Sequence, residues 1–115
     1  MTIKTEGFHA GEFLLSEANG TRSREEITLA ATGAVLPAGQ VLGRVTASGH
    51  YAAYDPDATD GSEAAAAVLW APVGISANPQ RSVGIVRDAE LKRALLTGLD
   101  TDAEDLLAAF GIIAR

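Results

Sequence analysis

Cysteine is absent from this chain of 115 residues, and aromatic residues make up only 5% of it. Without a thiol the chain has no disulfide, no thiolate metal ligand and no cysteine nucleophile. Large apolar side chains are scarce as well, because 22 of the hydrophobic residues are alanine. Alanine buries little area, so we expect a thin core, and small cores are often supplemented by oligomerisation. The composition therefore favours an oligomer.

Basic residues are nowhere concentrated along the chain. The closest grouping is Lys92 with Arg93, and the formal net charge is −6. Nucleic-acid binding needs a concentrated positive surface, so we expect no nucleic-acid partner. No apolar run is long enough to cross a bilayer, and the N-terminus lacks the apolar core of a signal peptide. We therefore expect a soluble protein that is made inside a cell, has no membrane partner and is not exported by a cleaved signal.

A change in composition near residue 26 divides the chain into two parts. Residues 1–25 are polar, and their main apolar features are Phe8 and the run "EFLL" (Glu12 to Leu15). Such a segment buries too little surface to fold alone. We predict an extended, flexible N-terminal arm over 1–25, which becomes ordered on contact with a partner, and a β-rich domain over 26–115. Whether the apolar side chains of the arm bind that partner or pack back onto the domain stays open.

The domain shows more strand patterns than helix patterns. Alternating or β-branched runs predict strands at 26–30, 41–47, 50–54, 68–70, 81–88 and 112–115. Asp88 is placed to cap a short helix over 89–96, and Thr101 with Glu104 forms a capping box for a helix over 101–111. The predicted fold class is mainly β with short helices.

The stretch from Leu36 to Gly61 holds His50, both tyrosines and three aspartates, which makes it the first candidate for chemistry. Its aspartates do not fit a calcium loop, because the twelfth position from Asp55 is Ala66 instead of glutamate. Neither histidine has a partner at metal-ligand spacing. Turn residues explain the stretch better, so we predict structural turns at Pro37, Gly39, Gly43, Gly49, Asp55, Pro56 and Gly61. No catalytic residue, metal site or cofactor is predicted.

Several segments resemble, in order, the lambda-type head decoration proteins of tailed bacteriophages. They are "SREEITL", "LPAGQVLG", "YDP", "DGS", "VRDAE" and "GII", and the similarity runs from about Glu12 to Arg115. It implies a β-clip-like fold, which is a bent two-stranded ribbon with a small sheet and an α+β periphery. It also implies a homotrimeric structural virion protein without enzyme activity.

The same resemblance implies where such a protein acts. Made in the host bacterial cytoplasm, the trimers bind the outer surface of the expanded capsid at threefold and quasi-threefold positions. There they cement subunits of the major capsid protein and stabilise the head against internal DNA pressure. The arm adds as a strand to capsid elements, and the capsid-binding candidates on this chain are Phe8, Glu12, Phe13, Leu14, Leu15 and Ser16.

Two other functions stay open. The first is a small β-clip module that binds a carbohydrate or another small ligand. The second is a hydrolase that uses Asp57, Asp60 or His50.

Overall fold

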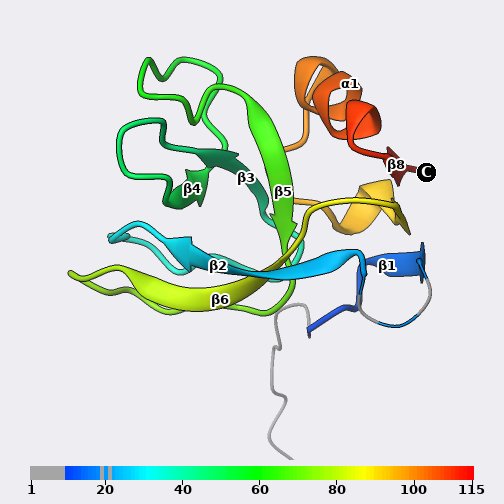
Figure 1. The fold of residues 1–115 in the computed structure, drawn as a ribbon, viewed down its shortest axis with the longest axis horizontal. Helices are drawn as coiled ribbons and strands as arrows, with labels where there is room; N and C mark the ends of the chain where they lie inside the picture. The colour runs from blue at the N-terminus through cyan, green and yellow to red at the C-terminus, as the bar shows by residue number, and fades with distance from the viewer. Residues whose placement is uncertain (1–9, 19, 21) are drawn as a thin grey trace, which may run out of the picture.

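The computed structural model describes residues 10–18, 20 and 22–115, which form a mainly β fold (Figure 1). The strands are β1 (Leu14–Glu17), β2 (Arg24–Leu29), β3 (Val41–Arg44), β4 (Tyr51–Ala53), β5 (Ala65–Leu69), β6 (Gln80–Ile85), β7 (Ala89–Leu91) and β8 (Ile112–Ala114). The helical elements are the 3-10 turn η1 (Arg93–Leu95) and the helix α1 (Thr101–Ala109).

A long antiparallel ribbon organises the fold. One of its strands covers residues 24–43 and the other covers residues 65–85. The paired residues include Arg24 with Ile85, Leu29 with Gln80, Leu36 with Val73, and Val41 with Val68. The pair β2–β6 and the pair β3–β5 are therefore two halves of one ribbon.

The ribbon doubles back, and its two halves join edge to edge. β5 pairs with β6 in antiparallel fashion, and β4 pairs with β2 in parallel through Leu29 and Tyr51. The strands then form a closed barrel in the order β2-β4-β3-β5-β6. Closure removes the free strand edges that an open sheet would present.

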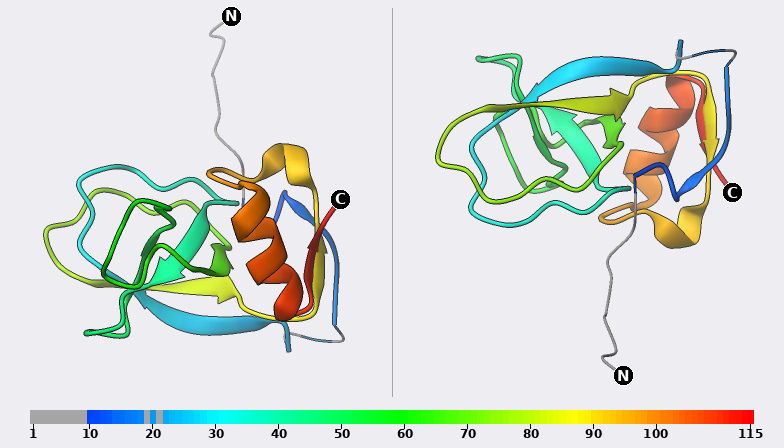
Figure 2. Two further views of the ribbon diagram at one scale, coloured as in Figure 1. Left: turned by 90° about the horizontal axis from the view of Figure 1, so that it is seen from above. Right: turned by 90° about the horizontal axis from the view of Figure 1, so that it is seen from below.

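A second sheet, with the strand order β1-β7-β8, lies beside the barrel together with α1 (Figure 2). Its central strand β7 is antiparallel to β1 and parallel to β8. A parallel pair needs a crossover connection, and residues 92–111, with η1 and α1, supply it.

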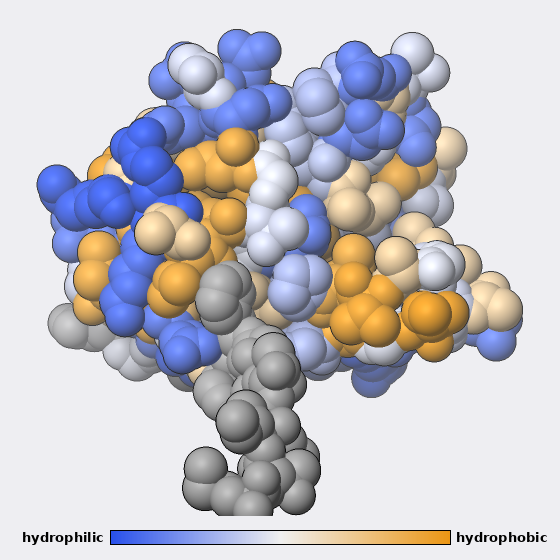
Figure 3. Space-filling view, turned by 180° about the vertical axis from the view of Figure 1, so that it is seen from behind, coloured by the Kyte–Doolittle hydropathy of each residue, from blue (hydrophilic) through white to orange (hydrophobic). Residues whose placement is uncertain are grey.

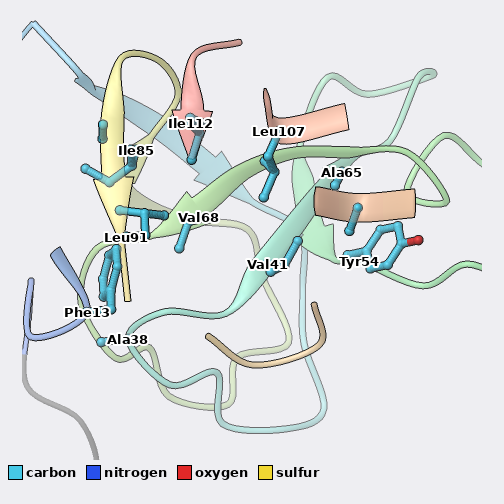
Figure 4. Packing of buried hydrophobic residues seen from close by; sticks show 12 residues of the cluster. Phe13, Ala38, Val41, Tyr54, Ala65, Val68, Ile85, Leu91, Leu107 and Ile112 are labelled. Atoms are coloured by element: carbon cyan, nitrogen blue, oxygen red, sulfur yellow. The ribbon is translucent and has the colours of Figure 1, made fainter. Parts of the chain in front are cut away.

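In the part of the chain that the structure describes, two apolar clusters form the core, and the β3–β5 pair separates them. Because side chains alternate across a strand, Leu42 and Leu69 point into the barrel while their neighbours Val41 and Val68 face the other way. The outer cluster, shown in Figure 4, joins Val41, Val68 and Ile85 of the barrel to residues of the N-terminal segment, the second sheet and the helix: Phe13, Leu91, Leu107 and Ile112.

The mainly β class predicted from the sequence is confirmed. The strands predicted at 41–47 and 50–54 are present as β3 and β4, which pair in antiparallel fashion with Leu42 opposite Ala53. The closed barrel was not predicted. Its closure depends on contacts between strands far apart in the sequence, above all Leu29 with Tyr51, and no local pattern records them.

The predicted helix over 89–96 is wrong. Residues 89–91 form β7, and only the short turn η1 follows. Asp88 does not cap a helix, since its backbone has a φ of +48°. Ala89 and Leu91 are both buried, and their spacing of two is that of a strand, which here gains hydrogen-bonded partners on both edges.

The helix over 101–111 is confirmed as α1, but its cap is one residue earlier than predicted. The Asp100 carboxylate accepts a hydrogen bond from the Ala103 N–H at 2.7 Å, and Glu104 pairs with Arg93 instead of closing a capping box. Asp100 also accepts the Tyr54 hydroxyl at 2.9 and 3.0 Å. Burial and this carboxylate raise the pKa of Tyr54 to about 12, so the contact ties the barrel to α1 throughout the neutral range.

The residues assigned to turns lie between the barrel strands, except Gly43, which lies within β3. The Pro37 carbonyl accepts the Gln40 N–H, and the Asp55 carboxylate, next to Pro56, accepts the Asp57 N–H. Positive φ angles occur at Gly39, Gly49 and Gly61. Gly43 lies at a register shift between β3 and β5, where a Cβ would be only 2.6 Å from the Ser62 Cα.

We expect Gly43→Ala to destabilise the barrel. The added methyl group would push β3 away from the backbone of Ser62, and overpacking of this kind costs about 1–3 kcal/mol. Urea unfolding measures the loss. Gly74→Ala is the matched control, because a Cβ there meets nothing within 4 Å, and equal stability losses in both variants would contradict the close approach.

Candidate functional site

Near the start of the described residues, Gly11 packs against the indole of Trp70, the one tryptophan of the protein. The Gly11 N–H donates to the Trp70 carbonyl at 3.0 Å. A Cβ at Gly11 would lie 2.7 Å from the Trp70 Cζ2, and Gly11 has a φ of +68°. Only glycine fits such a contact without strain, so the path of the chain is set at this point.

Phe13 follows Gly11 into the core. Its ring is fully buried and meets Trp70 edge to face, with 6.2 Å between the ring centroids and 72° between the ring planes. Of the two possibilities left open for the apolar residues of the arm, Phe13 takes the second, because it packs back onto the domain.

Arg24 contacts the same indole. Its guanidinium lies 3.6 Å from the centre of the Trp70 ring and donates two hydrogen bonds to the Glu17 carboxylate, at 2.6 and 3.1 Å. The Ser23 hydroxyl donates to the same carboxylate. Burial acts to raise the pKa of Glu17, but the hydrogen bonds from Ser23 and Arg24 outweigh it and hold the pKa below its usual value. Glu17 and Arg24 thus clamp the end of β1 to the start of β2.

The remaining candidates of the arm differ in exposure. Leu14, Leu15 and Ser16 lie in β1, an edge strand of the second sheet, where Ser16 donates to Glu90 at 3.0 Å. Leu14 is half-buried and packs against the outer cluster, whereas Leu15 is 49% exposed. Glu12 is exposed, and Phe8 lies outside the described residues.

The arm predicted over 1–25 therefore includes structured residues. β1 covers four of them, and β2 begins at Arg24, so the predicted boundary between arm and domain falls inside a strand. Local composition could not reveal this, since β1 owes its order to pairing with β7, more than seventy residues away.

Exposed apolar side chains gather at two ends of the molecule. At one end the ribbon turns back, and Val35 and Ile75 there are 62% and 66% exposed. In Figure 3 this end is the orange area at the lower right, which is the left end of Figure 1. At the other end three side chains are exposed: Leu106 in α1, Phe110 directly after α1, and Ile113 in β8. Sequence reasoning singled out neither end.

The residues considered for a hydrolase are not arranged for acid–base chemistry. The Asp60 carboxylate accepts the Ser62 hydroxyl at 2.6 Å and the Ser62 N–H at 3.0 Å, and both bonds lower its pKa. A carboxylate with a lowered pKa is a poor proton donor at neutral pH. His50 lines an open hollow of about 430 Å³ beside Arg44 and Tyr51, in which Asp57 and Asp60 take no part. In the described part of the chain, no group of His, Cys, Asp and Glu side chains could hold a metal ion, and no helix could span a membrane.

Comparison with known families places the protein. Residues 3–112 match the family model described as the bacteriophage lambda head decoration protein D. No curated protein matches the chain significantly. The match defines a structural, non-enzymatic virion protein on the capsid surface of the phage head. The chain belongs to the bacteriophage lambda head decoration protein D family, as the sequence segments led us to expect. Membership implies a role in stabilising the capsid.

The Glu17–Arg24 clamp leads to a pH-dependent prediction. Glu17→Gln should lower the free energy of unfolding by about 1.5–3 kcal/mol at pH 7, as expected for hydrogen bonds to a charged group. Because the folded-state pKa of Glu17 lies below its unfolded value, this contribution is complete above the unfolded pKa. It disappears as the pH falls through the folded pKa.

Urea unfolding of wild type and variant between pH 7 and pH 3 measures the difference. Glu26→Gln is the control, since Glu26 is 66% exposed and pairs with Arg81 at 3.4 Å, and exposed pairs contribute about 0–1 kcal/mol. A difference for Glu17→Gln that stayed constant down to pH 3 would rule out the clamp.

Proposed function

We infer that the protein acts as a homotrimer on the outer surface of the expanded phage capsid. In this proposal the trimers occupy threefold and quasi-threefold positions, cement neighbouring subunits of the major capsid protein and stabilise the head against internal DNA pressure. The observation that carries the proposal is the family match, which spans residues 3–112. The ribbon of residues 24–43 and 65–85, doubled on itself, supports interpretation of the domain as a β-clip.

The packing of the single chain supports an oligomer. The interior consists of two separate clusters of 12 and 6 buried residues, and each is small for a domain of this length. Meanwhile Val35, Ile75 and Phe110 remain about half exposed or more. Association would bury such side chains and add the apolar contacts that a small core lacks.

The N-terminal contact with the capsid is assigned to the segment before Gly11 and to the outer edge of β1. Phe13 is committed to the core, which leaves Phe8 and the exposed Leu15 as the apolar candidates. An edge strand such as β1 offers main-chain hydrogen bonds to an added strand, and alternate side chains supply specificity. Three such contacts on one trimer would act together and raise the avidity by roughly 10² to 10⁴.

Deleting residues 2–9 should abolish or strongly weaken decoration while the domain stays folded. The deletion stops before Gly11 and therefore preserves the contacts of Gly11 and Phe13 with Trp70. Sedimentation of shells with bound protein measures binding, and the fluorescence of Trp70 reports whether the N-terminal contacts of the domain are intact. Undiminished binding by the deletion variant would exclude residues 2–9 from the capsid contact.

The whole proposal is tested by mixing the full chain with undecorated expanded capsids and, separately, with unexpanded procapsids. Binding to the expanded shells and not to the procapsids is expected. Binding to neither would refute the proposed function.

A further inference from the structure

The bend at which the ribbon doubles back is exposed and yet carries no charge. Residues 27–43 and 64–80, which form its two strands around the bend, contain no Asp, Glu, Lys or Arg. The most exposed large apolar side chains in the described chain, Val35 and Ile75, lie at this bend. Depletion of charge together with exposed apolar side chains is the composition of an interface core.

We call this bend the ribbon tip (residues 32–36 and 73–76). Backbone hydrogen bonds between its two strands hold it in one shape. Thr32 and Ser76 exchange backbone bonds at 3.0 and 3.1 Å, and Leu36 and Val73 do so at 2.9 and 2.8 Å. Val35 and Ile75 lie between these two bridges on opposite strands. A tip that is already ordered can bind a partner without the cost of ordering a loop.

The opposite end of the molecule carries a second apolar surface, the helix-end patch, which consists of Leu106, Phe110 and Ile113. These side chains are 39%, 48% and 36% exposed. They belong to consecutive elements, because Phe110 follows α1 directly and Ile113 lies in β8. In all three ribbon views the ribbon tip lies at one end and the α1–β8 region at the other (Figures 1 and 2).

We propose that the ribbon tip of one copy packs on the helix-end patch of a second copy, head to tail. This inference rests on the homotrimer of the proposed function and names its contact surface. Two different patches on one chain make a heterologous contact, which forms a closed ring when the rotation between copies closes. An uncharged apolar tip needs an apolar receptor, and the helix-end patch supplies one on the same chain.

The exposed apolar area of the ribbon tip and the helix-end patch is large enough for the centre of an interface, but not for a whole one. At about 25 cal/mol per Å² a large apolar side chain corresponds to roughly 60–120 Å², so the exposed parts of these five side chains amount to roughly 150–300 Å². A specific interface buries about 1,200–2,000 Å² in total. The five side chains would form its centre, and the uncharged ribbon surface around the tip would supply much of the rest.

A mixing experiment with the full chain tests the head-to-tail contact. The tip variant carries Val35→Asp and Ile75→Asp, and the patch variant carries Phe110→Asp. Light scattering after size exclusion should show the wild type as a trimer and each variant alone as a monomer, with association weakened at least tenfold. In an equimolar mixture the intact tip of one variant meets the intact patch of the other. The mixture should therefore form dimers and stop there.

Control variants add the same charges away from the proposed contacts. Ala47→Asp with Thr59→Asp matches the tip variant, and Ala108→Asp, on the side of α1 turned away from Leu106 and Phe110, matches the patch variant; all three positions are exposed. The controls should remain trimers, and thermal unfolding should show every variant to be folded.

The possible failures can be told apart. If the wild type is a trimer and both variants stay trimeric, or if the mixture of monomers yields no dimer, the head-to-tail contact is refuted and the trimer stands. A tip variant that stays trimeric but no longer binds expanded capsids would make the capsid the partner of the tip, which also refutes the contact. A wild type that is monomeric, or that forms open polymers, would refute the trimer itself.

Discussion

The pairing of residues 24–43 with residues 65–85 is the constraint on which the rest of the structure depends. Because β2–β6 and β3–β5 are halves of one ribbon, the place of one half sets the register of the other. Doubling back encloses one apolar cluster in the barrel, while the outward side chains of β3 and β5, Val41 and Val68, form the floor on which α1 and the second sheet pack. A slip of one residue would exchange the two sets of side chains, so both clusters depend on this register.

Trp70 joins this ribbon to the N-terminal segment. The residue follows β5 directly, and Gly11, Phe13 and Arg24 all lie against its indole. Gly11, Phe13 and the strand β1, which were assigned to the arm, are thereby part of the domain, held by aromatic packing and by the Glu17–Arg24 clamp. This packing supports the proposal that capsid contacts involve the residues before Gly11 and the exposed side of β1, with the domain as a rigid base.

Local features of the sequence predicted most of the elements but not their closure. A strand before Pro72 and the helix α1 follow from short-range patterns, although their bounds differ. β5 covers 65–69 instead of 68–70, and α1 ends at Ala109 and is capped by Asp100, which serves both Ala103 and Tyr54. Residues 89–91 show the limit of such patterns. Ala89 and Leu91 satisfy a strand period, whereas Leu91 and Leu95 satisfy a helical one, and the strands β1 and β8 on both sides decided the outcome. The burial of Phe13 likewise depends on Trp70, which lies far along the chain.

The distribution of charge is compatible with the self-association proposed for this chain, whose net charge is −6. Residues 55–63 and 100–105 hold eight of its 15 acidic residues and no basic residue, so the other residues carry nine basic against seven acidic side chains. The two segments lie together, because Tyr54 and Pro56 line one hollow with Glu63, Asp102 and Asp105. Repulsion between copies is thus concentrated around this hollow. Leu106 lines the same hollow, so the side of the helix-end patch nearest to it is the least favourable for a negatively charged partner. An uncharged ribbon tip can approach this side of the patch without that cost.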